Sequence, residues 1–85
     1  MSTNDVYHPI NCDDYDNLEL ACQQHMLLTL ELKNGETLQA KADALVTRKN
    51  VEYLLVDNAG TVRELRLDTI SKYSNPQLGE MIVSE

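Results

Sequence analysis

The central part of the chain limits its possible folds more than any other segment. From 26 to 33 apolar residues alternate with other residues, which is the pattern of a β-strand with one buried face. Asn34-Gly35 follows, and this dipeptide favours a type I′ hairpin turn, whose two central positions both need a positive φ. A second strand is therefore predicted to begin near Glu36.

The remaining strands are predicted from turn signals and residue type. Arg48-Lys49-Asn50 and Asn58-Ala59-Gly60 have the composition of turns, and the segment between them is rich in β-branched and aromatic residues. One short helical turn is expected at about 68–71, before Asn75-Pro76 interrupts the chain. The five expected strands cover about 26–33, 36–46, 51–57, 61–68 and 81–83.

A helix is predicted over about 13–24, ahead of the first strand. Asn11 or Asp13 can cap its start, and carboxylates in its first turns complement the positive end of the helix dipole. Apolar residues spaced by three and four give the helix one packing face. These residues are Tyr15, Leu18 and Cys22.

Five strands in a chain of 85 residues have to protect their edges, because an exposed edge strand pairs readily with other chains. Closure into a small barrel removes these edges, and a long second strand of small residues can bend between its two halves. The predicted fold class is mainly β with an N-terminal α-helix, as a small five-stranded barrel that is Sm-like or SH3-like rather than an OB-fold. One domain is expected over 1–85, with an N-terminal segment at 1–12 and the barrel at about 26–83.

Negative charge is concentrated in the first third of the chain. Of the 14 Asp and Glu residues, six lie before Lys33, and no Lys or Arg precedes that position. The formal net charge of -7 makes direct nucleic-acid binding costly, because contacts with phosphates need a basic surface. This asymmetry indicates a protein-binding function near the N-terminus, with a basic partner.

The candidate binding residues lie where the predicted helix starts. Acidic residues stabilise a helix N-terminus, but two would suffice for that role, and the others add repulsion that nothing nearby compensates. The carboxylates are expected to face water and to pair with Lys and Arg side chains of a partner, while the tyrosine could occupy a slot for a nucleobase. The candidate residues are Asp13, Asp14, Tyr15, Asp16 and Glu19.

A second candidate is the turn Arg48-Lys49-Asn50, which holds the only adjacent basic pair in the chain. Such a pair can be a solvated corner, or it can form the rim of an interface with a partner of mixed charge. Both interpretations stay open from the residues alone.

Neither a metal site nor an enzyme is predicted. Two thiols and two imidazoles have the chemistry of zinc ligands: His8, Cys12, Cys22 and His25. However, a helix between the two cysteines separates them by about 15 Å, whereas zinc ligands converge within about 4 Å. The same separation excludes a disulfide. The chain has no serine nucleophile elbow and no Gly-rich phosphate loop, so no catalytic residue and no cofactor is expected.

The chain is predicted to be cytoplasmic. No apolar run approaches the roughly 18 to 20 residues that a membrane span needs, and the N-terminus lacks the pattern of a signal peptide. Two cysteines are too few for a disulfide framework, which fits a reducing compartment.

Four stretches of the chain resemble the Rof (YaeO) family. The longest, residues 7–22, reads YHPINCDDYDNLELAC, and the others read LTLELK at 28–33, RKNVEYL at 48–54 and RELRLD at 63–68. Departures lie mainly near the two ends and in one turn. The resemblance therefore covers nearly the whole chain.

The resemblance implies an inhibitor of the transcription termination factor Rho, a hexameric RNA-dependent ATPase and helicase. Members are expected to have an Sm-like barrel preceded by a helix, and to bind the N-terminal region of Rho that forms its primary RNA-binding site. By position, the acidic helix residues carry over as the contact surface, with Arg48, Lys49 and Asn50 as a neighbouring contact. The expected partner is thus Rho, with no direct nucleic-acid binding, and the alternative is an Sm-like RNA-binding module.

Overall fold

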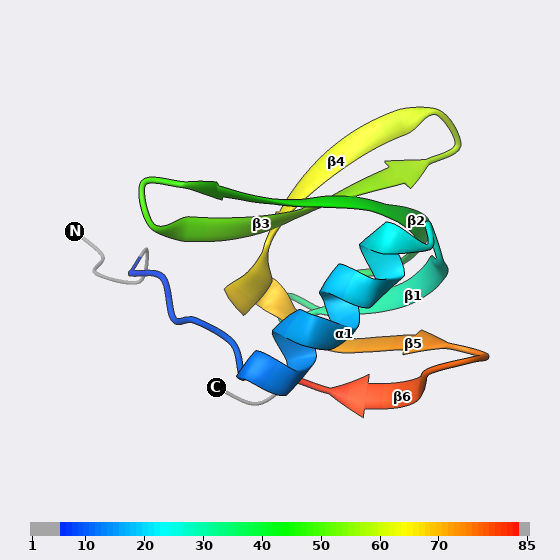
Figure 1. Cartoon of the computed structure of the whole chain (residues 1–85), viewed down its shortest axis with the longest axis horizontal. Coiled ribbons are helices and arrows are strands. Elements are labelled where there is room, and N and C mark those ends of the chain that lie inside the picture. Colours follow the sequence, from blue (N-terminus) through cyan, green and yellow to red (C-terminus); the bar gives the residue numbers. More distant parts are fainter. Residues whose placement is uncertain (1–5, 84–85) are drawn as a thin grey trace.

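A computed structural model of the chain describes residues 6–83. Within this range, one α-helix precedes a six-stranded antiparallel sheet with the strand order β4-β3-β2-β1-β5-β6 (Figure 1). No helix in it has the length and apolar character needed to cross a membrane. The elements are α1 (Cys12–Gln23), β1 (Leu27–Leu32), β2 (Thr37–Arg48), β3 (Val51–Asn58), β4 (Thr61–Arg66), the 3-10 turn η1 (Leu67–Thr69), β5 (Ile70–Asn75) and β6 (Gly79–Ile82).

The first hairpin, β1 and β2, is confirmed, but its turn is not of type I′. Leu32 donates its backbone N–H to the carbonyl of Glu36 at 2.8 Å, which leaves a three-residue loop between the strands. Only Gly35 in this loop has a positive φ, of 94°, and the Asn34 side chain accepts from the N–H of Glu36 at 2.9 Å. Three-residue loops place a left-handed residue last, so a single glycine satisfies this turn.

Two consecutive residues with positive φ, as a type I′ turn requires, occur instead in two of the three other hairpin turns within residues 6–83. Lys49 and Asn50 join β2 to β3 with φ of 51° and 67°, and Ala59 and Gly60 join β3 to β4 with φ of 53° and 89°. Two consecutive left-handed residues match the twist of the flanking strands. Three non-glycine residues therefore adopt a conformation that the sequence signals did not assign to them.

The prediction of a closed five-stranded barrel is wrong. The sheet has six strands and stays open, with β4 at one edge and β6 at the other. The missing strand is β5, which pairs with β1 and contains an extra residue, Ser71, opposite the step from Glu31 to Leu32. This bulge places both Ile70 and Tyr73 in the core. The buried residues of β5 are therefore three positions apart, so the strand lacks the alternation of apolar and polar residues by which strands are predicted.

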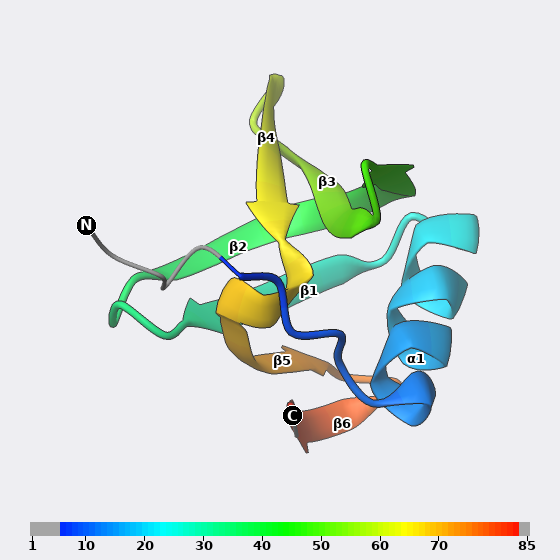
Figure 2. The ribbon, with the colours of Figure 1, turned by 90° about the vertical axis from the view of Figure 1, so that its left-hand side faces the viewer.

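The core lies between α1 and the curved sheet, and β2 connects the two parts of that sheet. β2 pairs with β1 through its first half and with β3 through its second half, and a bulge at Asp43 separates the halves. Figure 2 shows α1 on one side of the sheet, where it packs mainly against β2. Leucines dominate this core, as expected for a chain without Phe or Trp, and Tyr73 is its one fully buried aromatic residue among residues 6–83.

Candidate protein-binding surface

The start of α1 presents carboxylates to solvent. Asn11 caps the helix, and its Oδ1 accepts from the backbone N–H of Asp13 at 2.7 Å. Asp13, Asp16 and Glu19 are exposed and follow one another at a spacing of three. The predicted helix is thus confirmed with its bounds shifted by one residue, and three of the four predicted carboxylates lie on the surface.

Asp14 is the exception, and the prediction that it faces water is wrong. The residue is only 8% exposed, and its Oδ1 accepts from the hydroxyl of Tyr73 at 2.8 Å. Asn17 Nδ2 donates to the same hydroxyl oxygen at 3.1 Å. Asp14 lies four residues before Leu18, which is fully buried, so it belongs to the packed face of the helix. Burial raises the pKa of Tyr73, and the Asp14 carboxylate raises it further, so this hydroxyl remains a donor.

A hollow of about 270 Å³ lies beside the exposed carboxylates. It is lined by Pro9, Ile10, Cys12, Tyr15, Asp16 and Glu52. Two of these residues are acidic, one is aromatic and none is basic, so the hollow suits a cationic side chain. Burial raises the pKa of Tyr15, and Glu52 raises it further, so the ring is neutral at physiological pH.

Glu52 was not predicted, because it lies on β3 and is far from the helix in the sequence. The hydroxyl of Tyr7 donates to its Oε1 at 2.8 Å, which orients the carboxylate at the rim of the hollow. Burial and this hydrogen bond raise the pKa of Tyr7. We use the term acidic surface for Asp13, Asp16 and Glu19 of α1 together with Glu52 of β3.

The turn Arg48-Lys49-Asn50 is exposed, and Glu52 follows it by two residues on β3. Arg48 forms an ion pair with Glu64, and its guanidinium lies over the ring of Tyr53 at 5.1 Å from the centroid. Lys49 and Asn50 extend into solvent from a left-handed backbone. The structure therefore connects the second predicted site to the acidic surface through one strand.

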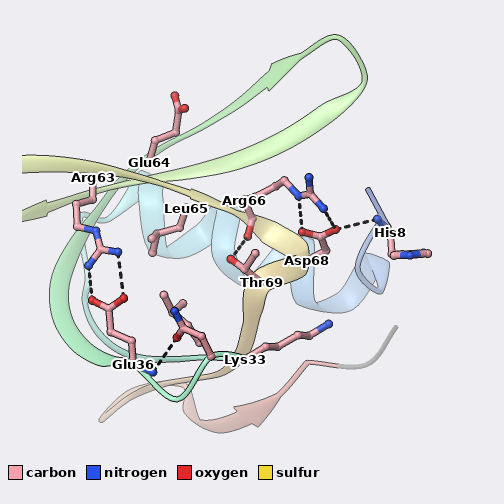
Figure 3. A pocket seen from close by; sticks show the side chains of 11 residues that line it. His8, Lys33, Glu36, Arg63, Glu64, Leu65, Arg66, Asp68 and Thr69 are labelled. Atoms are coloured by element: carbon pink, nitrogen blue, oxygen red, sulfur yellow. Dashed lines mark hydrogen bonds and ion pairs between the residues drawn. The ribbon is translucent and has the colours of Figure 1, made fainter. Parts of the chain in front are cut away.

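The segment before α1, residues 6–10, is hydrogen-bonded to an ion pair at the end of β4 that was not predicted from the sequence. Arg66 donates to both carboxylate oxygens of Asp68, at 2.7 and 2.8 Å. Asp68 Oδ2 also accepts from the backbone N–H of His8 at 3.1 Å (Figure 3). Burial opposes ionisation of Asp68, but these donors hold its pKa below the ordinary value of 3.8.

The two cysteines lie at opposite ends of α1, as predicted. Cys12 is exposed at the start, Cys22 is buried near the end, and both are free thiols. Within residues 6–83, no three His, Cys, Asp or Glu side chains are grouped closely enough to hold a metal ion.

Alkylation should distinguish the two thiols. Burial raises the pKa of Cys22 to about 11, so its reactive thiolate is scarce at pH 8, and its side chain is also inaccessible. We expect iodoacetamide to modify Cys12 alone in the folded protein, as measured by peptide mass spectrometry. Equal modification of both thiols before unfolding would contradict the packing of α1, and urea-unfolded protein provides the control for full labelling.

The chain is similar to known proteins both in sequence and in fold. The family model described as modulator of Rho-dependent transcription termination (ROF) matches residues 9–83. The proteins named rof of Escherichia coli K12 and Shigella flexneri are each 70% identical over 82 residues, covering 96% of this chain and 98% of theirs. A solved structure titled YaeO bound to magnesium, from Vibrio cholerae O395, has a TM-score of 0.72 at 23% identity, covers 80% of this chain and 95% of its own, and supports the fold.

Proposed function

Since the chain belongs to the ROF family of modulators of Rho-dependent transcription termination, we propose that it inhibits termination by occupying the RNA-binding surface in the N-terminal region of Rho. The family is one of transcription regulators and not of enzymes. A regulator of this kind acts where transcripts are made, so its location is the cytoplasm.

The observation that carries the proposal is the acidic surface. Asp13, Asp16 and Glu19 are exposed, and no Lys or Arg occurs before position 33. A surface that binds RNA presents Lys and Arg to phosphates, and the same side chains pair with carboxylates. Association with Rho is therefore steered by opposite charges and weakens as salt screens them.

The hollow beside Tyr15 supplies the specific part of the contact. A Lys or Arg side chain of Rho enters it, pairs with Asp16 and Glu52, and lies against the ring of Tyr15. Partial enclosure strengthens such a pair relative to one in open water, because solvent screens it less. The hollow thus favours a cationic side chain over a nucleobase.

Asp14 has a different role in the proposed contact. Its carboxylate is buried and holds the helix against Tyr73, so it positions the acidic surface and is not itself a contact with Rho. Lys49 and Asn50 extend from the neighbouring turn and meet acidic or polar groups at the rim. The mechanism is exclusion: while the protein is bound, the transcript is not captured, and no bond is made or broken.

Competition between this protein and RNA for Rho tests the proposal. We expect fluorescently labelled protein to bind purified Rho. Cytidine-rich RNA should displace it, because RNA and this protein compete for the same surface. Raising the salt concentration from 50 to 200 mM should weaken binding by about tenfold or more, since several charge pairs form. A ternary complex of Rho, RNA and this protein, with termination unaffected, would reject the mechanism. Retention of RNA by the isolated protein would instead favour the Sm-like RNA-binding module.

A further inference from the structure

The segment 6–10 reaches α1 without regular secondary structure, so side-chain contacts have to determine its course. Val6, His8 and Pro9 are exposed, and Ile10 is buried just before the helix cap. The contacts that hold its first half converge on Arg66 and Asp68. Nη2 of Arg66 lies 3.5 Å from the carbonyl oxygen of Val6.

Tyr7 connects this ion pair to the acidic surface. The guanidinium of Arg66 lies over the Tyr7 ring at 5.8 Å from the centroid, and the Tyr7 hydroxyl donates to Glu52 at 2.8 Å. Glu52 in turn lines the hollow together with Tyr15. A chain of contacts therefore runs from the end of β4 through the N-terminal segment to the candidate binding site.

We infer that Arg66 and Asp68 are positioning residues for Rho binding, which hold segment 6–10 so that Tyr7, Glu52 and the start of α1 form one preorganised surface. This inference rests on the proposed function. Asp68 is 6% exposed and accepts three hydrogen bonds, so it acts by fixing its donors and does not contact the partner. A preorganised surface loses less conformational entropy on binding, and this raises its affinity.

A comparable ion pair on the same side of the molecule provides a matched control. Arg63 of β4 donates to both carboxylate oxygens of Glu36, at 2.6 and 3.2 Å. Figure 3 shows this pair across the hollow of about 560 Å³ from Arg66, Asp68 and His8. Within residues 6–83, neither Arg63 nor Glu36 forms a hydrogen bond or ion pair with segment 6–10, so loss of this pair should leave the acidic surface in place.

Two substitutions with opposite effects on net charge separate positioning from electrostatic steering. Asp68→Asn removes one negative charge, and Arg66→Gln removes one positive charge. Steering predicts that the first weakens binding to Rho and the second strengthens it. Positioning predicts that both weaken it, by about tenfold each, with the salt dependence of binding unchanged. Arg63→Gln and Glu36→Gln should bind within about twofold of the unaltered protein.

Amide hydrogen exchange distinguishes local release of segment 6–10 from a general loss of stability, because the latter would speed exchange throughout the sheet. In both variants the amide of His8 should exchange at least about tenfold faster, while amides of β1 and β2 keep their protection. If Asp68→Asn does not fold, Arg66→Gln is sufficient, since only positioning predicts weaker binding by a more negative protein. Unchanged or tighter binding by Arg66→Gln overturns the inference alone. Absence of Rho binding by the unaltered chain overturns the proposed function and this inference with it.

Discussion

Asp16→Lys is expected to weaken binding to Rho at least about a hundredfold while the protein stays folded. Asp16 is exposed and lines the hollow beside Tyr15, so a lysine there both removes one pairing partner and repels the incoming cation. Placing like charges face to face at an interface costs several kcal/mol, of which about 2.7 kcal/mol already corresponds to a hundredfold. Anisotropy titration of labelled protein with Rho measures the affinity, and circular dichroism verifies the fold.

Glu80→Lys is the matched control for this prediction. Both substitutions raise the formal net charge of -7 by two, and Glu80 lies on β6 with a side chain that is 68% exposed. A general electrostatic effect would weaken both variants alike. We expect Glu80→Lys to retain affinity within a few-fold, and equal losses in the two variants would refute a localised acidic surface.

Asp14→Lys, two residues away, is expected to prevent folding at ordinary temperature. The side chain is buried against the hydroxyl of Tyr73, which donates to it and itself accepts from Asn17, so an ammonium group there would lose its hydration and find no carboxylate to pair with in this contact. Introducing an uncompensated buried charge costs about 3 to 5 kcal/mol, a large fraction of the stability of a small domain. Circular dichroism and urea titration measure the loss, with Asp16→Lys as the exposed comparison.

Tyr73→Phe examines the same contact with a smaller change. It removes the hydroxyl that donates to Asp14 but keeps the ring in the core, so the free energy of unfolding should fall by about 1 to 3 kcal/mol. In a domain of this length, each kcal/mol lowers the melting temperature by roughly 4 to 8 °C. A melting temperature equal to that of the unaltered protein would show that the buried hydrogen bond does not stabilise the helix on the sheet.

The two Asp residues show how far the sequence leads at the candidate site. Local signals located the helix, narrowed its cap to Asn11 or Asp13 and identified the carboxylates in its first turns, because capping and helix periodicity depend on neighbours within four residues. The same periodicity places Asp14 in line with the buried Leu18, a hint that the acidic composition obscured. Its partner Tyr73 is 59 residues away, and nothing local identifies it.

The strands show a similar division. Alternation in β1 and glycine or asparagine in the turns predicted the first four strands, since these features follow from the pleat and from backbone sterics. β5 was missed because the bulge at Ser71 changes the phase of its buried residues, and the bulge exists only through pairing with β1. Whether the edge strands pair to close a barrel depends on the curvature of the whole sheet, which no single strand specifies.

The sequence by itself determined the helix, most of the strands, the excess of acidic residues near the N-terminus and the family, because each depends on neighbouring residues or on similarity along nearly the whole chain. Only the tertiary structure decided which carboxylates reach solvent. It also brought Glu52 to the wall of the hollow and placed Asp68 where it binds the segment that precedes the helix. The reason is physical: burial and hydrogen bonding depend on contacts between side chains that are distant in the sequence, and these contacts form only when the helix packs against the sheet.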